Sequence, residues 1–274
     1  MDPSSALLLA GAGLAAGFLA GLVGVGGGIV FAPVLFFYFE HIGIAPEIIA
    51  QLTLGSSLFC VLIATLAGAT FHYRNQAVDM RVAITVGILS SIAIAIVTPL
   101  ITTQRWYDGE AFQIVFSVVL LAVVVRMLFE REHADDPSPV ERHPWPALLG
   151  VGVAAGTISS AAGVGGGVVL VPSYHNILKL PMKRAIGTSS ATIILISLVG
   201  VVTYGSLGWD EATPQWTVGF VDLGHSAILA GASVLSANFG ARVAHRLPTR
   251  MLRYAFVLLA LIVAVRLLIG AFRG

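Results

Sequence analysis

Charged side chains are scarce in this chain. Only 11% of its 274 residues are Asp, Glu, Lys or Arg, whereas 57% are hydrophobic. A soluble domain carries roughly 25% charged residues, so this composition does not supply a water-facing surface. Apolar runs of about 20 residues recur along the chain instead, which is typical of a helical polytopic membrane protein.

Cysteine and early basic residues are also lacking. The single cysteine, Cys60, excludes a disulfide within the chain and a cysteine metal site. No Lys or Arg precedes Arg74, so the basic region of a cleavable signal peptide is missing, and we expect the first apolar segment to be retained. No Ser/His/Asp or carboxylate pair is placed for hydrolysis, and the histidine spacing gives no metal site. We therefore predict no enzyme activity, no cofactor, no metal and no nucleic-acid partner.

Proline and polar residues divide the apolar sequence into predicted membrane segments. Two blocks, Ala6–Phe39 and Ala147–Leu178, are too long for one span, because about 20 residues cross the hydrocarbon core. The remaining spans are predicted at Pro46–Phe71, Val82–Ile101, Ala111–Phe129, Arg184–Ser206, Val218–Ala241 and Leu252–Gly270.

Each long block is interrupted by a cluster of glycines with a proline five residues beyond the last of them. The clusters contain Gly24, Gly26, Gly27 and Gly28 before Pro33, and Gly163, Gly165, Gly166 and Gly167 before Pro172. Glycine and proline both disfavour helix interiors, so we expect the backbone to leave the helix here, with a short helix starting near Pro33. Unwound backbone at membrane depth must be covered by protein or line a cavity, which makes both breaks candidate substrate-binding sites.

The two halves of the chain resemble one another beyond the glycines. Leu54-Gly55-Ser56-Ser57 corresponds to Ile186-Gly187-Thr188-Ser189, and the segment endings at Arg126 and Arg266 also match. This indicates an internal duplication. We predict a first transmembrane repeat at 1–129, a charged linker at 130–146 and a second transmembrane repeat at 147–274.

The basic residues distinguish two topologies. With four full spans in each half they divide seven to eight, which violates the positive-inside bias. If each glycine-broken block is instead a re-entrant hairpin followed by three spans, the second half is inverted. Twelve of the fifteen basic residues then share a side, and only Arg105, Arg266 and Arg273 lie on the other. We therefore predict an all-α protein of two inverted-topology repeats, with the linker cytoplasmic and both termini outside; Ala6–Val23 crossing fully remains an alternative.

The predicted site has the chemistry of an anion receptor. No Lys or Arg lies in the middle of a span, but unwound N–H groups and the positive ends of two short helices would attract an anion. Nearby hydroxyls supply further donors: Thr53, Ser56, Ser57, Thr188, Ser189 and Ser190. Inverted repeats bring such broken helices together near the bilayer midplane.

Simpler interpretations compete with this one. Glycines such as Gly17 and Gly21 also allow close helix packing, and helix hydroxyls often bond to their own backbone. His72, Arg74 and Tyr204 are expected at span ends in solvated positions. Asp222 and His225, near the start of one span, are expected at the interface rather than in a proton relay.

The chain resembles the sulfite exporter TauE/SafE family over essentially its whole length. The resemblance is carried by Gly21–Gly28 with Pro33, Ala162–Gly167 with Pro172, Ala185–Ser189, and Gly240-Ala241-Arg242 with Leu247-Pro248. One stretch departs from the family pattern: in the first half, Leu54-Gly55-Ser56 replaces the Gly-Thr-Ser form that is present at Gly187 in the second half. The resemblance implies transport of sulfite, sulfonates or similar small sulfur-containing anions, usually outward across the bacterial inner membrane.

The sequence thus favours a secondary transporter or facilitator for a sulfur oxyanion that works by alternating access. An anion channel, an uptake permease for a related anion, and a structural subunit in which the glycines only pack helices are the alternatives. The expected partners are a small anionic substrate and the lipid bilayer, and a homodimer is left open.

Overall fold

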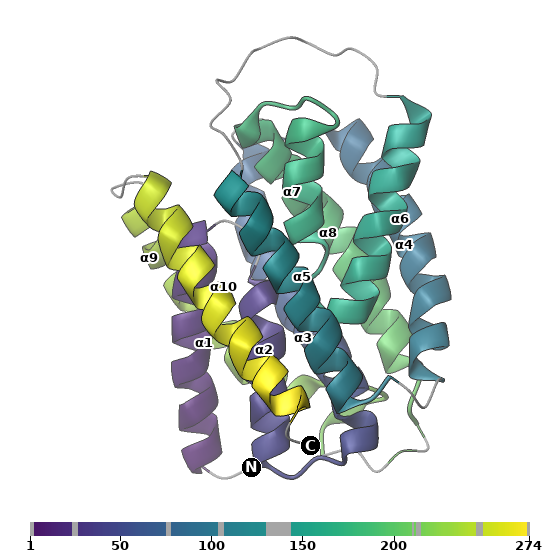
Figure 1. Cartoon of the computed structure of the whole chain (residues 1–274), viewed down its shortest axis with the longest axis vertical. Helices are drawn as coiled ribbons and strands as arrows, with labels where there is room; N and C mark the ends of the chain where they lie inside the picture. The colour runs from purple at the N-terminus through teal and green to yellow at the C-terminus, as the bar shows by residue number, and fades with distance from the viewer. Residues whose placement is uncertain are drawn as a thin grey trace.

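The computed structural model describes residues 3–23, 27–74, 78–103, 107–129, 144–209, 211, 215–244 and 249–272. These residues form helices and one short antiparallel ribbon (Figure 1). The elements are α1 (Pro3–Val23), α2 (Gly28–His41), α3 (Pro46–Arg74), α4 (Met80–Thr102), α5 (Gly109–Phe129), α6 (Trp145–Ala162), α7 (Gly167–Asn176), α8 (Met182–Gly205), β1 (Thr217–Val218), β2 (Val221–Asp222), α9 (Leu223–Ala244) and α10 (Thr249–Ala271).

Helix length and apolarity confirm an all-α polytopic membrane protein. Five described stretches are long and apolar enough to cross a membrane: Pro46–Ala67, Met80–Thr102, Gly109–Arg126, Trp145–Ala162 and Met182–Gly205. On α4 the side chains of Ile84, Ile88, Ile92, Ile96 and Leu100, one per turn, are about half exposed. An apolar row on an exposed helix face is suited to contact with lipid tails.

The helices pair across the two predicted halves. α1 packs along α9 and α6 along α4, while α3 packs on α8 and α5 on α10. Figure 1 shows α5 and α10 side by side at the front of the bundle, and α10 ending at the lower end, where α1 begins. The short helices α2 and α7 lie in the lower and upper halves of the bundle (Figure 1). The inverted repeat and its 1–129 and 147–274 boundaries stay predictions.

Two glycine seams hold the outer helices against their partners. A Cβ on Gly17 of α1 would overlap the backbone carbonyl of Ser233 on α9, and one on Gly156 of α6 would overlap that of Ser90 on α4. The structure therefore agrees with the packing interpretation of Gly17. The surroundings of Gly21 lie outside the part that the structure describes. Close approach of small residues is the usual way membrane helices associate.

Most helix ends fall close to the predicted segments, with one clear difference. The span expected to start at Val218 begins instead at Leu223, because 217–222 form the β1–β2 ribbon. Asp222 ends this ribbon and starts α9, its Oδ1 accepting a hydrogen bond from the His225 N–H at 2.9 Å. Most of the predicted linker, 130–143, lies outside the described residues.

Candidate functional site

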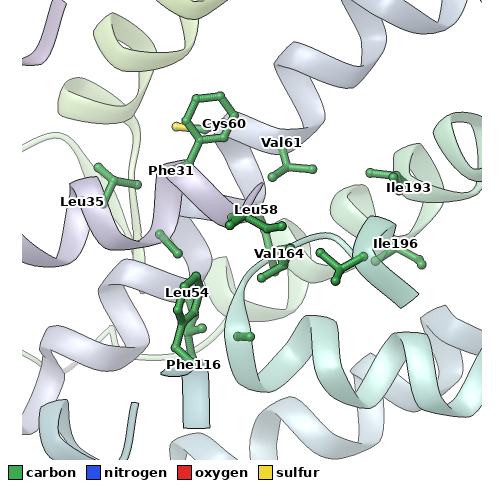
Figure 2. Close-up of a cluster of buried hydrophobic side chains, with 14 of the residues drawn as sticks. Phe31, Leu35, Leu54, Leu58, Cys60, Val61, Phe116, Val164, Ile193 and Ile196 are labelled. Carbon is green, nitrogen blue, oxygen red and sulfur yellow. The ribbon is translucent and has the colours of Figure 1, made fainter. Parts of the chain in front are cut away.

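The second glycine break is a buried, non-helical turn between α6 and α7. Gly163, Gly165 and Gly166 adopt positive φ angles of 64°, 71° and 76°, which suit glycine because it has no Cβ. All residues from Gly163 to Gly167 are buried. Figure 2 shows Val164 of this turn beside Leu58 of α3 and near Ile196 of α8. Protein therefore covers the unwound backbone, as membrane depth requires.

The first break is described from Gly27 onward, and Gly24 and Gly26 lie outside the described residues. Gly27 has φ 77° and is the N-cap of α2, as Gly166, with φ 76°, is of α7. A Cβ on Gly28 would overlap the carbonyl oxygen of Val164 in the second break. The two breaks predicted from the sequence therefore touch.

The prolines lie elsewhere than expected. Pro33 and Pro172 are both inside their helices, not at the first turn. The short helices begin at Gly28 and Gly167, because the left-handed glycine before each one turns the chain into the helix. The prediction of a helix starting near Pro33 is therefore wrong. Neither proline is part of the unwound backbone itself.

Three of the last four carbonyls of α6, those of Ser159, Ser160 and Ala161, accept protein donors. The Tyr204 hydroxyl donates to the Ser160 carbonyl at 2.8 Å, and the Tyr107 hydroxyl donates to the Ala161 carbonyl. The Gly163 N–H donates to the Ser159 carbonyl at 2.8 Å. Burial raises the pKa of the Tyr107 phenol well above its ordinary value, with a smaller effect of Tyr204, so Tyr107 remains a donor at neutral pH. The last carbonyls of a helix normally lack partners, and here phenols supply them.

The N-terminal ends at the breaks have no such partners. Neither α2 nor α7 has a side-chain cap on its first N–H groups. Uncapped N–H groups carry the positive end of the helix dipole and are a ready-made anion site. At the described part of this junction the helix starts therefore supply donors without a side-chain acceptor.

The predicted hydroxyls divide between the break and the helices. Ser57 reaches the break, because its hydroxyl donates to the Gly163 carbonyl at 2.8 Å. Ser56 instead accepts the N–H of Asp222 at 2.9 Å. Ser189 and Ser190 donate to the Ile186 carbonyl in their own helix at 2.9 and 3.0 Å.

Thr188 and Thr53 complete the predicted set. Thr188 accepts the N–H of Asp79 at 2.9 Å. The buried Thr53 hydroxyl has no hydrogen-bond partner among the described residues. Only Ser57 of the predicted hydroxyls therefore contacts the described part of a break.

Sequence reasoning missed two further hydroxyls near the second break. Ser197 on α8 is buried, its hydroxyl has no partner within the described structure, and it lies 3.4 Å from the position of a Cβ on Gly165. Ser159 in the last turn of α6 is also buried, and its hydroxyl has no partner in the described part of the chain. The sequence offered one signal for Ser197, its alignment with Thr65. Ser197 follows Gly187 by ten residues, as Thr65 follows Gly55.

Tyr204 and Asp222 lie deeper than expected. Tyr204 and Asp222 are both 0% exposed, whereas the sequence placed the first in a solvated position and the second at the interface. The Tyr204 hydroxyl donates to the Ser160 carbonyl, and the Asp222 carboxylate is bonded to the N–H and Nδ1 of His225, which offsets the cost of burying these polar groups. The side chains of His72 and Arg74 lie outside the described set.

The family and the relatives of this multi-pass helical bundle are membrane transporters, not enzymes. The family model described as "Sulfite exporter TauE/SafE" matches residues 9–267, and the chain belongs to this family. It is 28% identical over 241 residues to "Probable membrane transporter protein MJ0441" of Methanocaldococcus jannaschii, covering 88% of this chain and 87% of that protein.

Bacterial relatives carry similar descriptions. A "Probable membrane transporter protein" of Haemophilus influenzae is 25% identical over 264 residues, which cover 93% of this chain and 95% of the relative. "Probable membrane transporter protein YunE" of Bacillus subtilis is 24% identical, with 75% and 81% covered. No solved structure matches the chain.

Proposed function

We propose that this transporter moves a small sulfur-containing oxyanion, such as sulfite or a sulfonate, outward across the bacterial inner membrane. The observation that carries the proposal is the unequal hydrogen bonding at the second break. The carbonyls of Ser159, Ser160 and Ala161 at the end of α6 accept protein donors, whereas the N termini of α2 and α7 have no side-chain cap. Such a junction favours a negatively charged ligand over a cation.

The proposed site combines backbone and hydroxyl donors. Gly27, Gly28, Gly166 and Gly167 present the starts of the two short helices. Ser197 contributes the unpaired hydroxyl nearest to Gly165. An oxyanion has several acceptor oxygens, so it can accept from both helix starts and from a hydroxyl at once. The family description supports sulfite-like substrates.

The proposed mechanism is alternating access between inverted repeats. The contact of Gly28 with Val164 supports a shared midplane site, because it joins a break from each half. The pairing of α1 with α9 and α6 with α4 supports the same symmetry. The twelve-to-three charge division supports a cytoplasmic linker.

Ligand-dependent thermal stability tests the proposal. The purified protein in detergent would be heated with sulfite, methanesulfonate, sulfate or chloride at matched ionic strength. A ligand at 100 times its Kd stabilises the folded state by about 2.7 kcal/mol, so the preferred oxyanion should raise the Tm well beyond chloride. An equal Tm with all four anions would contradict the proposal.

Flux measurements separate the transporter from the two transport alternatives. In proteoliposomes, a carrier that alternates access shows anion flux that saturates with concentration. An anion channel would show high flux with little saturation. An uptake permease would accumulate the anion against a negative interior potential when a second gradient is supplied.

A further inference from the structure

Two aspartates begin helices in matching ways outside the proposed anion site. Asp79 precedes α4, and its Oδ1 accepts from the Val82 N–H at 3.2 Å. Asp222 precedes α9, and its Oδ1 accepts from the His225 N–H at 2.9 Å. Each carboxylate therefore caps its helix, a favourable place for negative charge.

Each aspartate also ties its helix to the other half of the chain. The Asp79 N–H donates to the Thr188 hydroxyl of α8, and the Asp222 N–H donates to the Ser56 hydroxyl of α3, both at 2.9 Å. We call the second arrangement, of Asp222, His225 and Ser56, the Asp222 brace. Both arrangements therefore combine a helix cap with a hydrogen bond to the other half of the chain.

The cations beside the two aspartates are different in kind. Asp79 lies 3.7 Å from Arg184, whose side chain is 49% exposed. Asp222 is fully buried and its Oδ2 lies 2.5 Å from Nδ1 of His225, whose side chain is 13% exposed. A guanidinium is always charged, whereas imidazole changes charge between about pH 5 and pH 8. Only the Asp222 brace therefore contains a switchable charge.

The groups around this pair are neutral at physiological pH. On the described residues packed against it, the pair faces Tyr38 of α2, with ring centroids 5.1 Å apart, and Cys60 of α3, whose thiol donates to the Ser226 carbonyl. Tyr204 of α8 is committed to the Ser160 carbonyl. Residues 5–18 of α1 and the β1 strand carry no titratable side chain.

The titratable groups at the end of α2 lie on the surface of the protein. Glu40 and His41, at the end of α2, are both exposed. With His225 neutral, the pair therefore carries one buried negative charge, and a proton on Nε2 neutralises it.

The brace connects to the glycine break through adjacent residues of α3. Ser56 holds the Asp222 N–H, and the next residue, Ser57, donates to the Gly163 carbonyl at 2.8 Å. Adjacent residues of α3 thus contact the Asp222 N–H and the break, so a shift of the pair on protonation reaches the break through α3. Such a packed network is the physical basis of coupling between two sites.

We propose that Asp222 and His225 form a proton-binding site coupled to the anion site, so that the anion and a proton move together. The inference rests on the proposed anion transport. The incoming proton binds Nε2 of His225, since Nδ1 already shares its hydrogen with Asp222, and the pair changes from one negative charge to neutral. Anion binding at the break then becomes more favourable, and by reciprocity the bound anion favours the proton.

Methanesulfonate flux in proteoliposomes, measured with a trapped pH dye and a clamped membrane potential, tests the proposal. Methanesulfonate is chosen because its own charge does not change with pH. In the wild-type protein we expect the flux to rise on the order of tenfold from about pH 8 to about pH 5, with protons entering alongside the anion. His225→Asn keeps a donor near Nδ1 but cannot take the second proton. It should give slow, pH-independent flux without proton movement.

Two further variants sharpen the test. His225→Lys places a permanent cation beside Asp222, as Arg184 does for Asp79, and should give faster, pH-independent flux. The matched control is His41→Asn, an exposed histidine, which should keep the wild-type pH profile. A pH-independent wild-type flux, or a wild-type profile in His225→Asn, would overturn the proton site. Absence of any methanesulfonate flux in the wild-type protein would instead contradict the proposed sulfonate transport.

Discussion

Single hydroxyl groups at the second break have opposite expected roles. The Tyr204 hydroxyl completes the hydrogen bonding of the Ser160 carbonyl, whereas the Ser197 hydroxyl is buried without a partner among the described residues. The first is a structural contact, and the second is available to a ligand. Stability and ligand affinity should therefore respond differently to the loss of each.

Tyr204→Phe should destabilise the protein. It leaves the buried Ser160 carbonyl without its donor, which costs about 1–3 kcal/mol. Tyr254→Phe is the control, because Tyr254 is 62% exposed. The free energy of unfolding, measured in mixed micelles for both variants, checks this. Equal stability of the two variants would show that the Tyr204 hydrogen bond does not contribute to the free energy of unfolding.

Ser197→Ala should weaken anion binding without loss of stability. Removing an unpaired buried hydroxyl leaves no orphaned partner, while a bound oxyanion would lose one hydrogen bond worth about 1 kcal/mol, or roughly fivefold in affinity. The Kd for sulfite and the Tm without ligand would be measured together. A destabilised variant with unchanged Kd would show that Ser197 is a packing residue.

At the scale of helices, the stability of the protein should depend on the two glycine seams. Gly17→Ala on α1 and Gly156→Ala on α6 each direct a methyl group into a backbone carbonyl of the partner helix, so each should cost about 1–3 kcal/mol. Gly11→Ala on α1 is the control, because nothing lies within 4 Å of its added Cβ. Unfolding in mixed micelles measures all three. Equal stability of Gly17→Ala and Gly11→Ala would contradict close packing of α1 on α9.

The sequence predicted helices better than it predicted their ends. Apolar length located the spans, and paired glycines located the breaks, because both depend on local composition. The start of α2 depended on the left-handed Gly27 rather than on Pro33, and the start of α9 depended on a ribbon closed by Asp222. Backbone conformation at single residues and cross-strand pairing are not visible in hydropathy.

The candidate site was only partly accessible to sequence reasoning. The glycines were predicted from composition, but the phenol of Tyr204 was expected in a solvated position. Its role depends on α8 lying beside the end of α6. This contact between helices cannot be predicted when each span is considered separately. The same holds for Ser56, whose hydroxyl faces Asp222 from a distant part of the chain.

At the scale of the whole molecule, the inverted topology predicts which loops face the cytoplasm. In a Cys60→Ala background, single cysteines at Gln104 and Gly208 should react with an impermeant thiol reagent added to intact cells. Cysteines at Asn75 and His245 should be protected from the reagent. One membrane crossing separates Asn75 from Gln104, and one separates Gly208 from His245. Labelling of Asn75 and Gly208 from the same side would rule out the inverted repeats.

The central claim is that touching glycine breaks, one from each half, bind the transported anion. Gly27→Ala and Gly166→Ala introduce a Cβ at φ 77° and 76°, where an L side chain is strained, and also crowd the helix starts. Gly150→Ala is the matched control on α6, since nothing lies within 4 Å of its Cβ and alanine favours a helix by about 1 kcal/mol.

Sulfite flux into proteoliposomes, measured for these three variants and normalised to folded protein, tests this claim most directly. Because both breaks line one site, the account predicts that Gly27→Ala and Gly166→Ala each lose most of the flux, while Gly150→Ala retains it. Near-normal flux in both break variants would contradict the account.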